Sequence, residues 1–335
     1  MTTSTNPAGG SEIAVRAAVQ PAAPGKPGAQ GAARARAAEP VTARWLRRVL
    51  TAAVMGGIVG SAGAAELRRD LVYGEAGGER LLLDASVPEG AGPFPVAILI
   101  HGGGWNSGDK SGSDQPGNGA DITPWFAPLT AAKFVWFSIN YRHAPKHRWP
   151  ACFEDVQTAV RWVKAHAAEH KGDPERIALL GHSAGGHLAL MLATQSRADT
   201  RVQAVVGFAP VSDHEQDLAQ RGGLSTALQQ LLGLPKEVTP ASLQALRAIS
   251  PVNRVRTGMP PMLLLHGDAD KTVPLAQSQA WQRRMRSAGN TCDLIVLKGA
   301  PHALLPWEKS DPTWPAQMTT WLRATLAAAP AGARK

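Results

Sequence analysis

The sequence predicts an α/β fold, in which a mostly parallel central sheet is covered by helices on both faces. Short apolar runs of the length of buried strands alternate along the chain with longer helix-like segments. Such alternation is typical of parallel strands joined by helical crossovers. The apolar runs lie near residues 96–100, 134–140, 176–181, 203–208, 262–267 and 293–297, and the helix-like segments lie near 152–169, 185–195, 274–288 and 314–327.

The first elements of this unit have a different pattern. Residues 67–73 and 80–87 are strand-like and flank residues 74–78 (GEAGG), so we expect an antiparallel hairpin at the edge of the sheet. Two later stretches interrupt the alternation. Residues 106–124 form a polar, Gly-rich loop, and residues 212–259 form a small cap-like insertion with helix-like segments at 224–232 and 240–249.

Residues 181–185 (GHSAG) fit the pattern G-x-S-x-G between a strand-like run, residues 177–180, and a helix-like run, residues 186–193. This is the strand–turn–helix context of a nucleophile elbow, in which a serine on a sharp turn exposes its hydroxyl. Only small neighbours let the strand and the helix pass so closely, so the glycines have a steric role. The context predicts that Ser183 is a nucleophile.

Residues 101–105 (HGGGW) directly follow the apolar run at residues 96–100. Glycines here allow backbone N–H groups to converge on the negative charge that develops when a nucleophile attacks a carbonyl. We expect the N–H groups of Gly103 and Gly104, together with that of Ala184, to form an oxyanion hole. Without Ser183, a phosphate cradle or an ordinary Gly-rich loop would be the alternatives.

Two acidic residues and a histidine follow the last two apolar runs. Asp268 and Asp270 lie just after residues 262–267, and His302 lies just after residues 293–297. Loops at the carboxyl ends of parallel strands meet at the edge of the sheet where ligands bind. We predict His302 as the general base and Asp270 as the acid that orients it. Asp268 is the alternative acid, and its other role would be to shape the loop by accepting backbone hydrogen bonds.

The order of these residues is that of G-x-S-x-G hydrolases, with 87 residues from serine to acid and 32 from acid to histidine. With this set, the chain resembles the α/β-hydrolase superfamily over about residues 67–327. It resembles esterases similar to hormone-sensitive lipase and, more closely, bacterial acetylxylan and feruloyl esterase-like enzymes of the BD-FAE type. Residues 140–145 (NYRHAP) and 149–156 (WPACFEDV) look like the family's tyrosine-arginine-x-alanine-proline loop and the helix after it.

The resemblance implies an α/β-hydrolase fold, a serine hydrolase with no metal or organic cofactor, and a structural ion pair between Arg142 and Asp155. One residue departs from the pattern, because hormone-sensitive-lipase-like enzymes usually carry aspartate before the nucleophile and this chain carries His182. That variant is more similar to polysaccharide-deacetylating esterases, aryl-formamidases and prolyl-oligopeptidase-type peptidases. His182 is therefore a candidate substrate-binding residue.

Ten tryptophans are unusual beside six phenylalanines and two tyrosines. Those expected around the site would offer aromatic faces to a sugar ring or an aromatic acid. The candidate substrate-binding tryptophans are Trp105, Trp149 and Trp307. Trp125 is also expected on a loop at the rim of the site, whereas the expected core residues are Trp136, Trp162 and Trp321.

The first 65 residues have a separate character. Residues 1–40 are dominated by Ala, Gly, Pro, Thr and Arg and are predicted to be disordered. Three arginines between residues 44 and 48 precede an uncharged run, residues 49–65, that ends in small residues, so we expect a secretory signal peptide cleaved near Ala64/Ala65. A membrane anchor is the alternative, but 17 residues with four glycines are short and weakly apolar for spanning a bilayer. We therefore expect the protein to be exported, either to the periplasm or as a secreted protein, without stable membrane insertion after cleavage.

The remaining residues form one predicted catalytic domain, residues 66–329, and a short tail, residues 330–335. Seven basic and two acidic residues in positions 1–64 supply +5 of the net charge of +9, and the remaining +4 does not call for nucleic acid. The two cysteines, Cys152 and Cys292, are expected to be separate buried thiols, although an exported protein could oxidise them to a disulfide.

Two histidines four residues apart, His166 and His170, lack the zinc-protease arrangement and are expected at an exposed helix end.

Together these features predict a serine carboxylesterase that hydrolyses short-chain acyl esters, acetyl or similar, on sugar or aromatic alcohols. The loop at residues 106–124 and the cap-like insertion are expected to shape the pocket for a small-molecule or saccharide ester. The alternatives are an aryl-formamidase-like amide hydrolase, a prolyl-oligopeptidase-type peptidase, and a binding module with an inactive site. Export argues against the first, the lack of room for a propeller domain against the second, and the intact serine, acid and histidine against the third.

Overall fold

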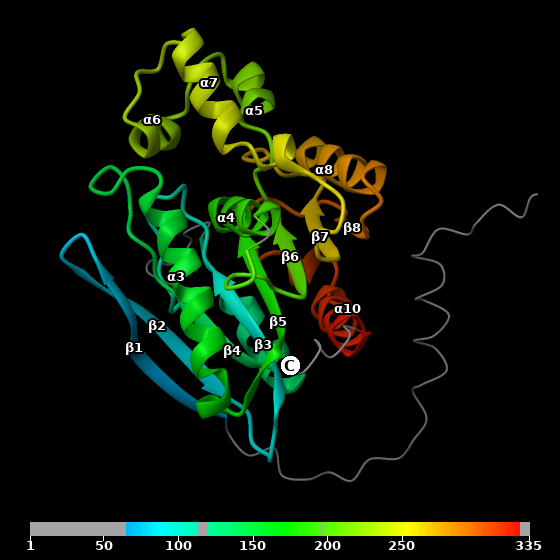
Figure 1. The fold of residues 1–335 in the computed structure, drawn as a ribbon. Helices are drawn as coiled ribbons and strands as arrows, with labels where there is room; N and C mark the ends of the chain where they lie inside the picture. The colour runs from blue at the N-terminus through cyan, green and yellow to red at the C-terminus, as the bar shows by residue number, and fades with distance from the viewer. Residues whose placement is uncertain (1–64, 113–119, 196, 329–335) are drawn as a thin grey trace, which may run out of the picture. The chain divides into compact units, whose positions relative to one another are not determined.

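The centre of the fold is an eight-stranded sheet with the strand order β1-β2-β4-β3-β5-β6-β7-β8 (Figure 1). The computed structural model describes residues 65–112, 120–195 and 197–328, all within one unit, Gly57–Lys335. The predicted leader, the predicted signal peptide up to Ala64, part of the polar loop (residues 113–119) and the tail lie outside the described residues.

The strands from β3 onward run parallel, whereas β2 pairs antiparallel with both β1 and β4. Ile100 at the end of β3 lies opposite Gly181 of β5, so the residues that follow these two strands emerge side by side. The strands are β1 (Glu66–Ala76), β2 (Glu79–Val87), β3 (Phe94–Ile100), β4 (Val135–Ile139), β5 (Gly172–His182), β6 (Ala204–Phe208), β7 (Met262–Gly267) and β8 (Cys292–Leu297).

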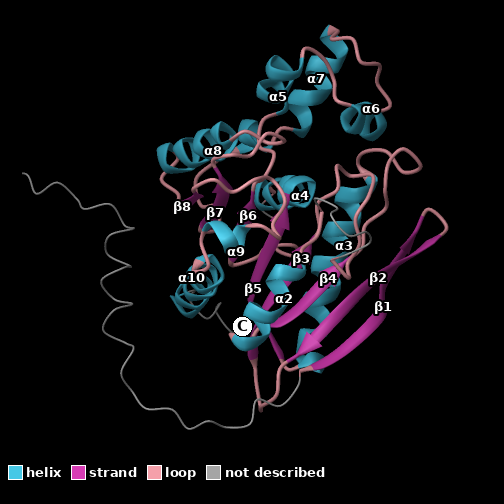
Figure 2. Ribbon diagram, turned by 180° about the vertical axis from the view of Figure 1, so that it is seen from behind, coloured by secondary structure: helices cyan, strands magenta, loops and turns pink. Residues whose placement is uncertain are grey.

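Helices cover both faces of the sheet, as the alternating pattern predicts (Figures 1 and 2). One buried cluster joins the sheet to α3 (Ala151–His166), α4 (Ser183–Thr194) and α8 (Leu275–Ser287). A second cluster on the other face joins it to α2 (Phe126–Ala131) and α10 (Trp314–Ala328). No helix in the part of the chain that the structure describes is long and apolar enough to cross a membrane.

The hairpin and the first long helix differ in detail from the predictions. The turn between β1 and β2 is only Gly77 and Gly78, with φ values of +60° and +78°, because a two-residue turn with two left-handed residues matches the twist of the strands. The predicted helix near 152–169 ends as α3 at His166 and continues as a 3-10 turn, η2 (Ala167–His170).

The expectation that His170 is exposed is wrong. Its ring is buried between Phe137 and Trp162, with centroid distances of 5.2 and 6.0 Å, and its Nδ1 lies 3.2 Å from Nη1 of Arg68. Burial, followed by the positive charge of Arg68, lowers the pKa of His170 below its usual value. His170 is therefore a neutral packing residue that connects η2 to Arg68 of β1.

The insertion at residues 212–259 is mainly helical and lies beyond the carboxyl ends of the parallel strands (Figure 1). Its helices begin at residues that are good caps, because the side chains of Asp213, Ser225 and Thr239 each accept a hydrogen bond from the first turn of the helix that follows. The helices are α5 (His214–Arg221), α6 (Thr226–Leu232) and α7 (Pro240–Ile249), followed by the short turn η3 (Pro251–Arg254).

Candidate active site

Ser183, His302 and Asp270 lie together where β5, β7 and β8 end. The distance from His302 Nε2 to Ser183 Oγ is 2.9 Å, and the distance from His302 Nδ1 to Asp270 Oδ2 is 2.7 Å. A carboxylate only accepts hydrogen bonds, so Nδ1 carries the proton and Nε2 is left to accept the hydrogen bond of the serine hydroxyl. This tautomer makes Nε2 a base directed at Ser183.

The backbone at Ser183 is strained in the way that a nucleophile elbow requires. Its φ is +53°, in the left-handed region that a residue with a side chain rarely adopts. A Cβ atom at Gly181 would lie 2.3 Å from the carbonyl oxygen of Gly185, and one at Gly185 would lie 2.3 Å from the carbonyl oxygen of Ile100. The glycines on either side of Ser183 therefore permit the close passage of strand and helix that holds the serine on its sharp turn.

Asp270, and not Asp268, faces His302. The other carboxylate oxygen of Asp270, Oδ1, accepts hydrogen bonds from the backbone N–H groups of Thr272 (2.8 Å) and Val273 (2.9 Å), which fix the side chain. Burial alone would raise the pKa of Asp270, but hydrogen bonds from His266 and His302 outweigh it and hold that pKa well below its usual range. Asp270 is thus a carboxylate at neutral pH and stabilises a positive charge on His302.

Asp268 makes a loop-shaping hydrogen bond, which is the alternative role that the sequence suggested for it. Its side chain is exposed, and its Oδ1 accepts a hydrogen bond of 2.6 Å from the backbone N–H of Gly299, just before His302 in the chain. No hydrogen bond connects Asp268 to the histidine among the described residues. The two acids on one loop therefore have different surroundings.

The predicted oxyanion turn lies against Ser183. A Cβ atom at Gly102 would lie 3.3 Å from Cβ of Ser183, and the φ values of Gly103 and Gly104 are +96° and +58°. Within the described residues, the N–H groups of Gly103 and Gly104 have no acceptor. Ala184 lies in the first turn of α4, where backbone N–H groups lack partners inside the helix. The structure thus brings together the three residues whose N–H groups were predicted to bind an oxyanion.

Tyr141, which the sequence analysis did not single out, supports this turn. Its hydroxyl donates to the carbonyl oxygens of Gly102 (3.0 Å) and His101 (3.2 Å), and its ring stacks on His101 with a centroid distance of 4.4 Å. The backbone N–H of Ala144 donates to the carbonyl oxygen of Trp105 at 2.9 Å. The loop after β4 therefore supports the oxyanion turn through Tyr141 and Ala144. The tyrosine within residues 140–145 is the sequence feature that could have predicted this contact.

The predicted pair of Arg142 and Asp155 anchors this loop in turn. Nη2 of Arg142 lies 2.7 Å from Oδ1 of Asp155, whose side chain is 1% exposed, and the backbone N–H of Arg142 donates to Oδ2 at 2.8 Å. The hydrogen bond with Asp155 raises the pKa of Arg142. The pair links the start of α3 to the loop that supports the oxyanion turn.

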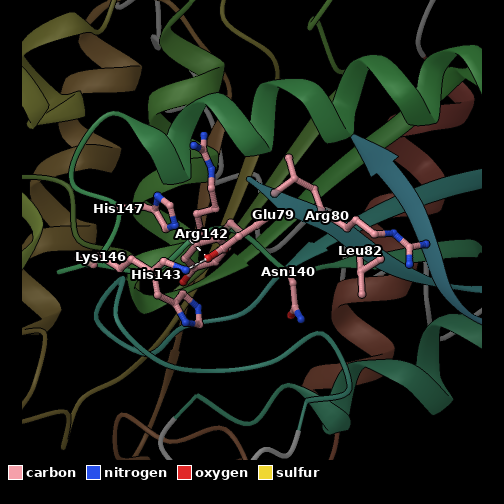
Figure 3. A pocket seen from close by; sticks show the side chains of 11 residues that line it. Glu79, Arg80, Leu82, Asn140, Arg142, His143, Lys146 and His147 are labelled. Atoms are coloured by element: carbon pink, nitrogen blue, oxygen red, sulfur yellow. Dashed lines mark hydrogen bonds and ion pairs between the residues drawn. The ribbon is translucent and has the colours of Figure 1, made fainter. Parts of the chain in front are cut away.

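A separate pocket of about 380 Å³ lies between this loop and the hairpin (Figure 3). Asn140, Arg142 and His147 contribute to its wall, opposite Glu79 and Arg80 of β2. Glu79 is paired with Lys146 and with His147, whose Nε2 lies 3.1 Å from its carboxylate. Ser183, Asp270 and His302 do not line this pocket, so it is distinct from the candidate active site.

The expected substrate-binding role of Trp307 is wrong. Trp307 is completely buried, donates its indole N–H to the carbonyl oxygen of Pro301 at 2.8 Å and packs on Trp314. Trp125 is also completely buried, against Phe208, and not on the rim as expected. Both rings fill the core between the sheet and α10, where burial of a large apolar surface is most favourable.

The other substrate-binding candidates divide into two groups. Trp105 is 5% exposed and His182 is fully buried, so neither offers a face to a ligand in this structure, contrary to expectation. Trp149 is partly exposed and stacks on Phe153. Of the four candidates, Trp149 alone is not buried.

His182 contacts His302, the predicted general base. Its Nε2 lies 3.0 Å from the backbone carbonyl oxygen of His302, and the two rings have a centroid distance of 4.9 Å. Burial, followed by repulsion from His302, lowers the pKa of His182 to about 3, so its ring is neutral at physiological pH. Because a carbonyl only accepts, Nε2 carries the proton, and His182 donates to the backbone carbonyl of His302.

We expect His182→Leu to lower kcat by about 10- to 100-fold, because a buried carbonyl left unpaired costs about 1–3 kcal/mol and the His302 loop would relax to recover it. His182→Gln can place an amide donor near the same position, so it should retain most of the rate. Steady-state kinetics on a chromogenic ester measures both, with KM within about twofold of wild type. Equal losses for the two variants would rule out the hydrogen bond as the cause.

The two cysteines are free, buried thiols. Burial raises the pKa of both Cys152 and Cys292 to about 12, so each stays protonated and neither supplies a nucleophile at neutral pH. Within the described residues, no group of three or more His, Cys, Asp and Glu side chains is placed to hold a metal ion.

The fold and this site define the class of protein: an α/β-hydrolase with a serine, histidine and aspartate aligned at a nucleophile elbow. The family model described as BD-FAE matches residues 83–285. The chain therefore belongs to the BD-FAE family.

Curated relatives are named as ester hydrolases. The probable carboxylic ester hydrolase LipM of Mycobacterium tuberculosis is 35% identical over 231 residues, which cover 65% of this chain and 51% of LipM. Esterase LipQ of the same organism is 32% identical, with 70% of this chain and 56% of LipQ covered. The chain thus matches little more than half the length of these two relatives.

Solved structures agree with the fold. A truncated carbohydrate esterase from gut microbiota has a TM-score of 0.67 and 25% identity, with 80% of this chain and 99% of that chain covered. Esterase 2 of Thermogutta terrifontis, solved after phosphoramylation by tabun, has a TM-score of 0.60 and 26% identity, with coverage of 79% and 96%. These structures share the α/β-hydrolase architecture with the chain.

Proposed function

We propose that the protein is a serine carboxylesterase that hydrolyses short-chain acyl esters, acetyl or similar, carried by sugar or aromatic alcohols. The observation that carries this proposal is the continuous line of hydrogen-bond contacts from Asp270 through His302 to Ser183 on a strained elbow. The names of the relatives support the choice of an ester over other acyl compounds.

In the proposed mechanism, Ser183 Oγ attacks the ester carbonyl while His302 Nε2 takes the hydroxyl proton. The N–H groups of Gly103, Gly104 and Ala184 stabilise the oxyanion, and Asp270 stabilises the protonated His302. The tetrahedral intermediate collapses as His302 returns the proton to the leaving alcohol, which leaves an acyl-enzyme on Ser183. Water, activated by His302, then hydrolyses this ester and releases the acid.

The preference for a short acyl group rests on how closely the cap lies over the oxyanion turn. Cβ of Ala227 in α6 is 3.3 Å from the position that a Cβ at Gly104 would occupy, and Nδ2 of Asn106 donates to Oε1 of Gln230 at 2.6 Å. A helix seated directly on the turn leaves little space there for a long chain. Structures of the Thermogutta terrifontis esterase with propionate and butyrate bound support the same size range.

We expect kcat/KM to fall at least tenfold from acetyl or butyryl to octanoyl esters of one alcohol, equivalent to about 1.4 kcal/mol of transition-state binding. The measurement is a panel of acetyl, butyryl, octanoyl and feruloyl esters with an aryl formamide and a prolyl anilide, each run beside Ser183→Ala as the blank. Faster turnover of octanoyl esters would contradict the short-acyl preference. Turnover of the formamide or anilide above that of every ester would contradict the esterase assignment.

A further inference from the structure

A buried cluster of aromatic rings connects the oxyanion turn, the nucleophile helix and the cap. Trp105 comes from the turn, His187 from α4 and His214 from the first residue of α5. The ring of His187 lies 5.4 Å from that of Trp105 and 4.9 Å from that of His214, measured between centroids. His187 and His214 are completely buried. His187 is thus enclosed between two segments that both lie over the site.

The hydrogen bonds of His187 fix its proton. The indole Nε1–H of Trp105 can only donate, and it lies 3.2 Å from Nδ1 of His187, so Nδ1 is the acceptor. Nε2 must then carry the proton, and it donates to the carbonyl oxygen of Ile249 at 2.7 Å. Burial lowers the pKa of His187 to about 4, which keeps this neutral tautomer at physiological pH.

Each hydrogen-bond partner of His187 lies at the end of a segment near the site. Trp105 has a φ of +61°, a left-handed conformation that is unfavourable for tryptophan and follows directly on Gly103 and Gly104. Ile249 is the last residue of α7, where carbonyl groups lack partners inside the helix. His187 therefore holds the strained end of the oxyanion turn through one nitrogen and the end of a cap helix through the other.

His187 also lies one helical turn after Ser183, on the same face of α4. The ring of His187 therefore lies close to the site and not near a remote surface. If Trp105 lost its indole bond, the turn could relax toward a less strained backbone, and the N–H groups of Gly103 and Gly104 would move from the place where the oxyanion develops.

We propose that His187 is a positioning residue that couples the cap insertion to the oxyanion turn, so that the seating of the cap sets the geometry of the oxyanion hole. This inference rests on the proposed function, because it assumes that the turn stabilises an oxyanion. Its effect belongs to the transition state, so kcat changes and the binding of the ground-state ester does not.

Three substitutions distinguish the effects of the two hydrogen bonds of His187, one from Trp105 and one to Ile249. Trp105→Phe keeps the ring and removes the N–H. His187→Gln can offer an amide donor to Ile249 but no acceptor to Trp105, and His187→Asn can offer a carbonyl oxygen near Nδ1 but no donor that reaches Ile249. We expect Trp105→Phe and His187→Gln each to lower kcat about tenfold with KM within twofold. The double variant should be no slower than the slower single variant, because both changes remove the same hydrogen bond, the one between Trp105 and His187.

His187→Asn tests the cap side. It should lose thermal stability, because the end of α7 is released, and it should also lower kcat on a small acetyl ester, although by less than His187→Gln because Trp105 keeps its acceptor. Multiplicative losses in the double variant, or an unchanged kcat in variants whose melting temperature falls, would overturn the coupling and leave His187 a packing residue.

A spectroscopic measurement keeps this test independent of the esterase assignment. Nitrogen-15 NMR of the wild-type protein should show that the His187 ring, assigned as the signal that is lost in His187→Gln, has protonated Nε2 and unprotonated Nδ1 from pH 5.5 to 8, and the Trp105 indole N–H signal should shift in His187→Gln. These signals can be observed even if every ester in the panel fails as a substrate, an outcome that would contradict the proposed function alone. A wild-type His187 protonated at Nδ1, or an indole signal that His187→Gln does not move, would overturn the inference.

Discussion

Ser183→Ala is expected to lower kcat by a factor of about 10⁴ to 10⁶ while the protein remains folded, because the serine, histidine and aspartate of such sites act as a unit. Ser183 Oγ is the group that lies 2.9 Å from the basic nitrogen of His302, and no other hydroxyl shares that contact among the described residues. Alanine has the same Cβ as serine, so the strain at φ +53° is unchanged and the elbow should persist. The measurement is single-turnover and steady-state hydrolysis of an acetyl ester.

Two controls support the interpretation of that loss. Circular dichroism and the melting temperature of the variant should match those of the wild-type protein, which separates lost chemistry from lost fold. A serine-reactive organophosphate should add once to the wild-type protein, at Ser183 by peptide mapping, and should not add to the variant. Labelling at a different serine, or a variant with near wild-type kcat, would show that the nucleophile lies elsewhere.

Asp270→Asn is expected to lower kcat by about 10³ to 10⁴, by analogy with other serine, histidine and aspartate sites. Oδ1 of Asp270 accepts two backbone hydrogen bonds, so the carbonyl oxygen of asparagine will occupy that position. Its NH₂ group will then face Nδ1 of His302, and two donors cannot bond to each other. His302 must shift its proton to Nε2, where it can no longer take the proton of Ser183.

Asp268→Asn is the matched control, because it makes the same chemical change on the same loop. Asp268 is exposed and accepts one backbone hydrogen bond, which the carbonyl oxygen of asparagine can also accept. We expect kcat within about threefold of wild type and a small fall in melting temperature. If the two variants showed the opposite pattern, Asp268 would be the acid that orients His302.

The sequence by itself determined the features that depend on neighbouring residues. The strand, the two glycines around Ser183 and the helix after it form a short local pattern, and the strained φ at Ser183 follows from that pattern. The strand-end positions of His302 and of the HGGGW turn are local for the same reason. The alternation of apolar runs and helical segments, which sets the fold class, needs no knowledge of long-range contacts.

Only the tertiary structure decided which side chains face the site. Asp268 and Asp270 have nearly the same sequence context, and the turn of the loop points one of them at His302. Trp307 resembled a rim residue by its position but is completely buried in the core between the sheet and α10. Composition and spacing do not reveal which surface an aromatic ring will cover.

The roles of His182 and His187 show the same physical limit. Their partners, His302 and Ile249, lie 120 and 62 positions away in the chain. The strand order and the position of the cap bring these residues together in space, so no local sequence pattern predicts the contacts. The local sequence specifies the sharp turn at Ser183, and the packing of distant segments decides which buried polar groups contact the residues around it, because each buried donor must find its acceptor wherever the fold brings one.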